Sequence, residues 1–192
     1  MKKFLKSIID KESFFPSYAI GIWINPFFIS RRGLSDGIVR FSSCIKNGVL
    51  LDVGCGSKPY ESCFDVDKYI GIDVKVSGHN HSSSKVDQFY DGKNIPFKNA
   101  YFDHVFSSQV FEHVLDLDDL LDEINRVLKA EGTFFFTCPF VWDEHEQPFD
   151  YRRFTSFFVD RKLERHGFAL IRLEKSSGYI ATVLQLLSAY IY

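Results

Sequence analysis

The sequence has almost no excess charge of either sign, and this absence limits the partners it can have. Its 192 residues include 23 lysines and arginines against 25 acidic residues, so the formal net charge is −2 and the sequence pI is near 6.3. Without a basic excess, nucleic acid is not expected as a bulk electrostatic partner. A small or locally recognised substrate fits this charge balance better.

The sequence also lacks a cysteine pattern and an export signal. None of the four cysteines belongs to a Cys-x-x-Cys pair, and Lys2, Lys3 and Lys6 interrupt the N-terminal apolar stretch that a signal peptide would need. The cysteines are Cys44, Cys55, Cys63 and Cys138. We therefore expect a reduced, cytoplasmic protein.

The chain does contain enough apolar material for one domain, with 45% hydrophobic residues and 21 phenylalanines. Apolar runs alternate with helical patterns, which is typical of βαβ units. We expect an α/β fold with a Rossmann-like, doubly wound and mainly parallel sheet, helices on both faces, and ligands bound at the carboxyl ends of the strands. The candidate strands are Val49–Val53, Tyr69–Asp73, Val86–Tyr90, His104–Ser108, Thr133–Cys138 and Ala169–Leu173.

Helix signals and composition suggest how the chain is divided. The strongest helical pattern runs from Asp118 to Lys129 and stops at Gly132, and Thr155 is a candidate N-cap for another helix. We expect residues 1–40 to form an N-terminal arm or lid, residues 41–175 the core of the domain, and residues 176–192 an apolar C-terminal helix.

A glycine-rich turn follows the first predicted strand. The strand reaches Asp52 and then breaks at Gly54 and Gly56, where the missing Cβ atoms let the backbone close on a ligand. We expect free amide groups to line this turn. A dinucleotide site would need a third glycine where Pro59 stands, and Asp52 would repel a pyrophosphate but attract a cation. The turn therefore suits a nucleoside without phosphates.

A second acid stands where a nucleoside needs one. Asp73 ends the second predicted strand 19 residues after Gly54, close to the spacing of a ribose-binding carboxylate. With these residues the sequence resembles the class I S-adenosylmethionine-dependent methyltransferases, in particular their small-molecule, type 11-like branch. The segments Asp91–Phe97, Phe111–Val114 and Glu123–Gly132 continue the likeness in the same order, and as a set they are specific.

The resemblance implies S-adenosyl-L-methionine as the cofactor. Asp52, Gly54 and Gly56 would hold its methionine end, and Asp73 would bind the ribose. Cys55 lies inside the same turn, where a small side chain that fits is favoured over a reactive thiol.

Two further residues complete the implied cofactor site. Asp91 would bind the adenine amino group, although capping of the turn before Pro96 is an alternative. Gln109 follows the fourth predicted strand and is expected to point into the cleft near the sulfonium.

His113 and His145 are the candidate catalytic residues, because an imidazole near neutral pKa can remove a proton from the acceptor as the methyl group arrives. For His113, a hydrogen bond to a neighbouring loop is an equally weighted alternative. Sulfonium chemistry requires no metal, and the pair His79 and His81 lacks a third ligand, so we expect no metal site.

The polar segment Trp142–Phe154 is the predicted acceptor site. Its acids and two arginines are costly to bury without a function or a partner. An arginine there would grip a carboxylate or phosphate of the acceptor, and Glu146 would orient His145. The candidate substrate-binding residues are Glu146, Asp150, Tyr151, Arg152 and Arg153. The alternative is a solvated loop held by ion pairs of the Asp150–Arg153 type.

The two ends of the chain fit the family pattern less well. Gly178–Tyr192 carries no charged residue, and the seventh strand of such methyltransferases is missing, so we expect a truncated chain. Self-association or peripheral membrane binding through Gly178–Tyr192 is the alternative. Lys2–Lys11 suggests a basic amphipathic helix, for which packing on its own domain is favoured over a membrane surface.

The expected function is methyl transfer from S-adenosylmethionine to a small-molecule or glycan-like acceptor, at oxygen ahead of nitrogen or carbon. Two alternatives remain. One is an NAD-dependent oxidoreductase on the same topology, which Pro59 disfavours, and the other is a non-catalytic domain that binds a partner through Gly178–Tyr192.

Overall fold

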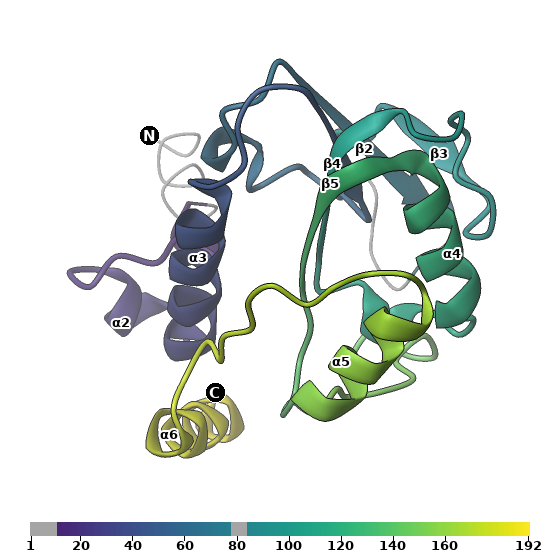
Figure 1. Cartoon of the computed structure of the whole chain (residues 1–192). Helices are drawn as coiled ribbons and strands as arrows, with labels where there is room; N and C mark the ends of the chain where they lie inside the picture. Colours follow the sequence, from purple (N-terminus) through teal and green to yellow (C-terminus); the bar gives the residue numbers. More distant parts are fainter. Residues whose placement is uncertain (1–10, 78–83) are drawn as a thin grey trace. The chain divides into compact units, whose positions relative to one another are not determined.

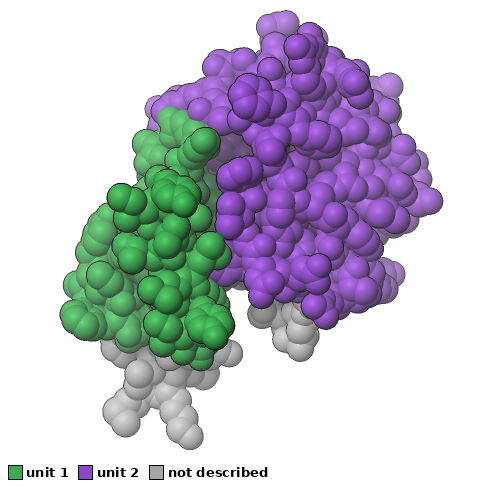
Figure 2. Space-filling model, turned by 90° about the horizontal axis from the view of Figure 1, so that it is seen from below, with its two compact units in different colours: residues 1–41, 174–192 green, residues 42–173 purple. Residues whose placement is uncertain are grey.

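The computed structural model describes residues 11–77 and 84–192, in two compact units (Figures 1 and 2). The first unit combines residues 1–41 with residues 174–192, and the second contains residues 42–173. The expected core, residues 41–175, overlaps the second unit. His79, His81 and the first nine residues of the expected basic helix lie outside the described residues.

The second unit is built on a five-stranded parallel sheet with the strand order β3-β2-β1-β4-β5. Its strands are β1 (Val49–Val53), β2 (Lys68–Val74), β3 (Gln88–Tyr90), β4 (Phe102–Ser108) and β5 (Leu128–Thr137). The chain extends from β1 to β2 and β3 on one side and then continues through β4 and β5 on the other. The strand order therefore reverses between β1 and β4, which is where open α/β sheets bind ligands. The predicted parallel, Rossmann-like α/β fold is confirmed.

Apolar side chains on one face of this sheet form the main core. β1 places Leu51 and Val53 in the same cluster as the apolar stripe of α4 (Leu117–Val127), and α5 (Ser156–Arg165) joins that cluster. On the opposite face, Phe106 of β4 meets Tyr60 and Phe64 at ring-centroid distances of 6.1 and 4.9 Å. These two aromatic residues flank the 3-10 helix η1 (Glu61–Cys63) in the β1–β2 connection, so connections cover both faces.

Local signals set the ends of several elements. The Thr155 side chain caps α5 by accepting a hydrogen bond from Phe158 N at 3.2 Å, as predicted. For the C-terminal end of α4 the prediction was wrong. α4 stops at Val127 and β5 begins directly at Leu128, so Lys129 and Gly132 belong to the strand. β5 absorbs this early start through a register irregularity, where Glu131 adopts a φ of 64°.

The predicted sixth strand is also wrong. Ala169–Leu173 forms no strand, and Ile171 in its centre is 93% exposed. The segment has an apolar composition, but a strand forms only where a neighbouring strand accepts and donates its backbone hydrogen bonds. Among the described residues the sheet ends at β5 on this side.

The first unit contains α2 (Gly21–Ile24), α3 (Phe28–Ser42) and the predicted apolar helix α6 (Tyr179–Ile191). Gln185 is the buried residue of α6; its amide donates to Pro26 O at 2.9 Å and accepts from Ser30 N at 3.0 Å. Other α6 side chains are exposed, including Tyr190 at 88%. No helix among the described residues has the length and apolarity that a bilayer span requires. Self-association or membrane binding through this segment stays a prediction.

Candidate active site

The glycine turn after β1 is pinned to the neighbouring strand. The amides of Gly54 and Cys55 both donate to Ile72 O, at 2.9 and 3.1 Å, so the expectation that free amides line the turn is wrong for these groups. Gly54 has a φ of 74°, and a Cβ at this position would lie 2.3 Å from Val110 Cγ2. Gly56 has a φ of 49°, and a Cβ there would meet no atom of the described residues within 4 Å. The turn is therefore closed at its first glycine and open at its second.

Asp73 at the end of β2 closes the other side of this turn. Its carboxylate accepts hydrogen bonds from Gly56 N at 2.9 Å and from Val74 N at 2.8 Å. The third amide of the turn is thus also engaged, because the adjacent parallel strand brings an acceptor to it. The predicted ribose-binding acid and the open glycine stand side by side at the carboxyl edge of the sheet.

Asp52 lies inside the protein, 3% exposed, and accepts a hydrogen bond from Tyr69 OH at 2.6 Å. Burial raises the pKa of Asp52 to about 7, although the Tyr69 hydrogen bond opposes this shift. Tyr69 was not predicted as a site residue. The strand register contains a usable signal, because Asp52 pairs with Gly71 and Tyr69 is two residues earlier on the same face of β2.

Because this carboxyl is buried, we expect Asp52→Asn to raise the free energy of unfolding by an amount that depends on pH. A carboxyl with a raised native pKa destabilises the folded state increasingly as pH rises from 3.8 to about 7. Each pKa unit corresponds to about 1.4 kcal/mol, so the penalty that Asn removes is at most about 4 kcal/mol above pH 7 and vanishes in acid. Urea unfolding of the ligand-free chain across this pH range measures it. A gain of equal size at every pH would contradict the expectation, and Asp160→Asn on the exposed face of α5 is the matched control.

Cys55 behaves as a small packed side chain. It is 3% exposed, and burial raises the pKa of its thiol above the ordinary value. The absence of a side chain on Gly71 makes room for it, since a Cβ on Gly71 would lie 2.6 Å from Cys55 Sγ.

The other two predicted cofactor residues are held by local contacts. Asp91 is exposed and accepts from the amides of Asn94 and Lys93 at 2.7 and 2.8 Å, and these hydrogen bonds lower its pKa to about 2. This is the turn-capping geometry anticipated as the alternative, and the adenine contact stays a prediction. Gln109 has a φ of 57°, and its side chain donates to Thr137 Oγ1 at 3.3 Å.

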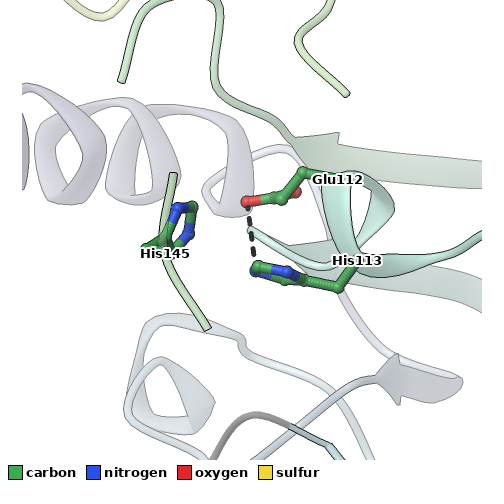
Figure 3. A group of neighbouring side chains, drawn as sticks. All are labelled: Glu112, His113 and His145. Atoms are coloured by element: carbon green, nitrogen blue, oxygen red, sulfur yellow. Dashed lines mark ion pairs between the residues drawn. The ribbon is translucent and has the colours of Figure 1, made fainter. Parts of the chain in front are cut away.

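The two predicted catalytic histidines lie together with a buried acid (Figure 3). The rings of His113 and His145 contact each other at a centroid distance of 4.9 Å, and Glu112 is adjacent. His113 Nδ1 is 2.8 Å from Phe149 O, which matches the alternative that this histidine binds a neighbouring loop. Glu112 is fully buried, and burial raises its pKa to about 8. Glu112 was not predicted as a site residue.

The predicted acceptor loop is tied together by an internal ion pair. Arg153 donates to both oxygens of Asp150, at 2.6 and 2.7 Å, and also to the backbone oxygens of Trp142 and Asp143. The Arg153 guanidinium holds the pKa of Asp150 well below its usual range. The side chain of Asp150 is 3% exposed, so this pair lies inside the loop rather than in solvent. The geometry corresponds to a structural role for these two residues.

The remaining predicted substrate residues surround the histidines. Tyr151 N donates to Glu112 O at 2.8 Å while its side chain is 41% exposed. Arg152 donates to Leu115 O at 2.6 Å, and Glu146 Oε2 lies 3.7 Å from His113 Nε2. The loop after β5 is thus joined to the 3-10 turn that contains Glu112 and His113. Val110, directly before this turn, lies beside Gly54 and so connects the histidine cluster to the glycine turn.

Comparison with known proteins shows what the segment around this site is similar to. Residues 51–136 match the methyltransferase domain family model. An uncharacterized protein of Methanocaldococcus jannaschii is 31% identical over 103 residues, which cover 52% of this chain and 40% of that protein. The sarcosine/dimethylglycine N-methyltransferase of Halorhodospira halochloris is 34% identical over 70 residues, which cover 36% of this chain and 24% of that protein. The chain thus spans less than half the length of either relative.

The fold comparison agrees. A Thermotoga maritima S-adenosylmethionine-dependent methyltransferase, described as a possible histamine N-methyltransferase, superposes with a TM-score of 0.59 at 15% identity, covering 85% of this chain and 81% of that one. The matched segment contains the glycine turn, both acids beside it and the start of the histidine cluster. The match of residues 51–136 to a methyltransferase domain disfavours the alternative of an NAD-dependent oxidoreductase on the same topology. Residues 51–136 are therefore similar to a methyltransferase domain, and this match together with the fold of the structural neighbours indicates S-adenosylmethionine as the cofactor.

Proposed function

We propose that this chain transfers a methyl group from S-adenosylmethionine to an oxygen atom of a small-molecule or glycan-like acceptor. The proposal rests mainly on the open backbone of Gly56 beside Asp73, at the carboxyl edge where the strand order reverses. The donor already carries its activated methyl group. The protein therefore mainly has to align donor and acceptor and to exclude water.

Each cofactor contact in this proposal has a chemical reason. Asp52, Gly54 and Gly56 hold the methionine end, because a buried carboxylate attracts the positive charges there. The Asp73 oxygens accept the ribose hydroxyls, as each can take a second hydrogen bond besides its backbone donor. Asp91 reaches the adenine amino group by the family's pattern, and Gln109 lies nearest the sulfonium.

For the acceptor, the proposal assigns the surface formed by Glu146, Tyr151 and Arg152. These residues lie around the histidine cluster, and the exposed ring of Tyr151 can contact a ligand. Asp150 and Arg153 support this surface by fixing the loop. His145 or His113 acts as the base only with a ring nitrogen that is neither protonated nor coordinated.

Nitrogen is the second candidate for the methylated atom. One relative is named a sarcosine/dimethylglycine N-methyltransferase, and one structural neighbour is described as a possible histamine N-methyltransferase. An amine acceptor must lose its proton before it attacks. A hydroxyl acceptor has a far higher pKa and needs stronger activation at the site.

The test is cofactor binding by the purified chain, measured by calorimetry with S-adenosylmethionine and S-adenosylhomocysteine. Asp73→Asn is expected to weaken both by at least about tenfold, because one good hydrogen bond to a charged group is worth about 1.5–3 kcal/mol. Asp160→Asn on α5 removes the same charge and should bind as the unmodified chain does. Formation of S-adenosylhomocysteine with hydroxyl and amine acceptor panels then identifies the atom. Cofactor binding unaffected by Asp73→Asn would refute the site, and complete absence of turnover would favour a non-catalytic binding domain.

A further inference from the structure

A buried carboxylate and two imidazoles converge at the junction of the 3-10 helix η3 (Phe111–His113) and the loop after β5 (Figure 3). One potential ligand atom from each of Glu112, His113 and His145 lies within 4.8 Å of the other two, among the residues that the structure describes. Figure 3 shows Glu112 and His113 facing each other with the ring of His145 beside them.

The hydrogen bond of His113 fixes which of its nitrogens is available. His113 Nδ1 lies 2.8 Å from Phe149 O, and a carbonyl oxygen can only accept, so Nδ1 carries the hydrogen. In the neutral ring the lone pair is then on Nε2. Within the described part of the chain this buried Nε2 has no hydrogen-bond partner. Such an arrangement, with Nδ1 anchored by a carbonyl, is how proteins orient metal-binding imidazoles.

His145 has a similar anchor. Its Nδ1 lies 3.1 Å from Asp150 Oδ2 and 3.2 Å from Asp143 O, and both atoms are acceptors. Arg153 Nη2, at 3.4 Å from the same nitrogen, already donates to those two residues at shorter distances. Nδ1 of His145 therefore carries a hydrogen, and its Nε2 is left as the ligand atom. A carboxylate behind a histidine is a frequent outer partner in zinc sites.

Glu112 is the buried carboxyl of the cluster, and a cation beside it would stabilise its ionised form. It is fully buried, and neither of its carboxylate oxygens has a hydrogen-bond partner among the described residues. His113 Nε2 lies 3.9 Å from Glu112 Oε1 and 3.7 Å from Glu146 Oε2, which is too long for hydrogen bonds. Two ligands on one tetrahedral zinc are on the order of 3.3 Å apart, so a small contraction would bring these atoms into coordination.

From these contacts we propose that Glu112, His113 and His145 bind a divalent metal ion, with Zn²⁺ as the ion that best suits two imidazole nitrogens and a carboxylate. Three protein ligands leave a fourth position, which Glu146, water or an acceptor atom can take. This site goes beyond the methyl transfer proposed above and departs from the sequence-based expectation of no metal. Coordination uses the lone pairs that a general base needs, so direct base catalysis by these histidines and metal binding exclude each other.

The experiment uses the full chain without a histidine tag, stripped of metals with EDTA. ZnCl₂ is titrated in competition with a chromophoric chelator, and CoCl₂ is added separately to record visible ligand-field absorption. We expect one equivalent of zinc and a cobalt spectrum with nitrogen and oxygen ligands. His113→Gln and His145→Gln should each weaken zinc binding by at least about tenfold, since even the loss of an outer-shell partner costs 10–100-fold.

The matched control is His166→Gln. His166 is occupied by Asp118 and Asp122 at 2.6 Å each and should not affect zinc binding. Because Glu112→Gln alters a buried group, it can disturb folding. The side chain of His145 is partly exposed, so His145→Gln is the substitution least expected to disturb the fold. An unfolding curve is recorded for each protein.

Two results would overturn the metal site. One is the absence of stoichiometric zinc binding by the unmodified chain. The carboxyl of Glu112 and the ring of His113 would then share a proton instead of a metal ion. The other is equal affinity in the unmodified chain and both histidine variants. Calorimetry with S-adenosylhomocysteine on the same samples reports separately on the methyltransferase proposal. Zinc binding without cofactor binding would refute that function and leave the metal site supported.

Discussion

Gly54→Ala is expected to destabilise the folded chain strongly. The new Cβ would lie 2.3 Å from Val110 Cγ2, in a backbone conformation with a φ of 74°. A left-handed conformation costs a non-glycine residue about 1–2 kcal/mol, and forced overpacking costs about 1–3 kcal/mol more. We therefore expect a loss of about 2–5 kcal/mol in the free energy of unfolding, measured by urea denaturation.

Gly56→Ala is the matched comparison. Its φ of 49° carries the conformational cost, but in the part of the chain that the structure describes no atom lies within 4 Å of the new methyl group. Stability should fall by only about 1–2 kcal/mol. Binding of S-adenosylhomocysteine should weaken, because the methyl group enters the open space beside Asp73. Equal destabilisation by the two substitutions would show that the contact with Val110 does not determine the conformation of the turn.

Arg153→Met should destabilise the acceptor loop by a comparable amount. The substitution retains much of the side-chain volume but removes the charge that pairs with Asp150, whose side chain is 3% exposed. Breaking a buried pair from one side costs about 3–5 kcal/mol, because the remaining charge is uncompensated. Two backbone oxygens, of Trp142 and Asp143, lose their donor as well. Urea unfolding at neutral pH measures the loss.

Two further variants test whether the loss comes from the unpaired charge of Asp150. Adding Asp150→Asn to Arg153→Met removes the stranded charge and should recover part of the stability. Arg161→Met breaks the exposed pair with Glu164, where both side chains are more than half exposed, and should change stability by less than about 1 kcal/mol. If Arg153→Met were no worse than Arg161→Met, the pair would not hold the loop.

The sequence predicts those parts of the fold that depend on local pattern. The bounds of β1 match the prediction, because an apolar run ends directly at the glycine turn. The apolar stripe of α4 and the Thr155 cap are also local features, and both are confirmed. Ala169–Leu173 fails because pairing is not local: an apolar run becomes a strand only beside another strand. The direct join of α4 to β5 likewise depends on the register with β4.

For the site, the sequence predicts candidate residues but not their hydrogen-bond and ion-pair partners. The two acids and two glycines were found from spacing along the chain, and the parallel strands bring them to one edge. The engagement of the turn amides by Ile72 O and Asp73 was not predicted, because it depends on the register of β2. The burial of Glu112 and the inward pairing of Arg153 depend on how a loop folds back, which no periodicity in the sequence reports.

In the proposed cofactor site, the buried Asp52 carboxyl has a consequence for the competition between donor and product. S-adenosylmethionine carries a sulfonium charge, and S-adenosylhomocysteine does not. A carboxyl with a pKa of about 7 is half ionised near neutrality, and only its ionised form favours the charged donor over the uncharged product. Discrimination between the two should therefore strengthen as the solution becomes more alkaline, so that inhibition by accumulated product is greatest on the acid side of neutrality.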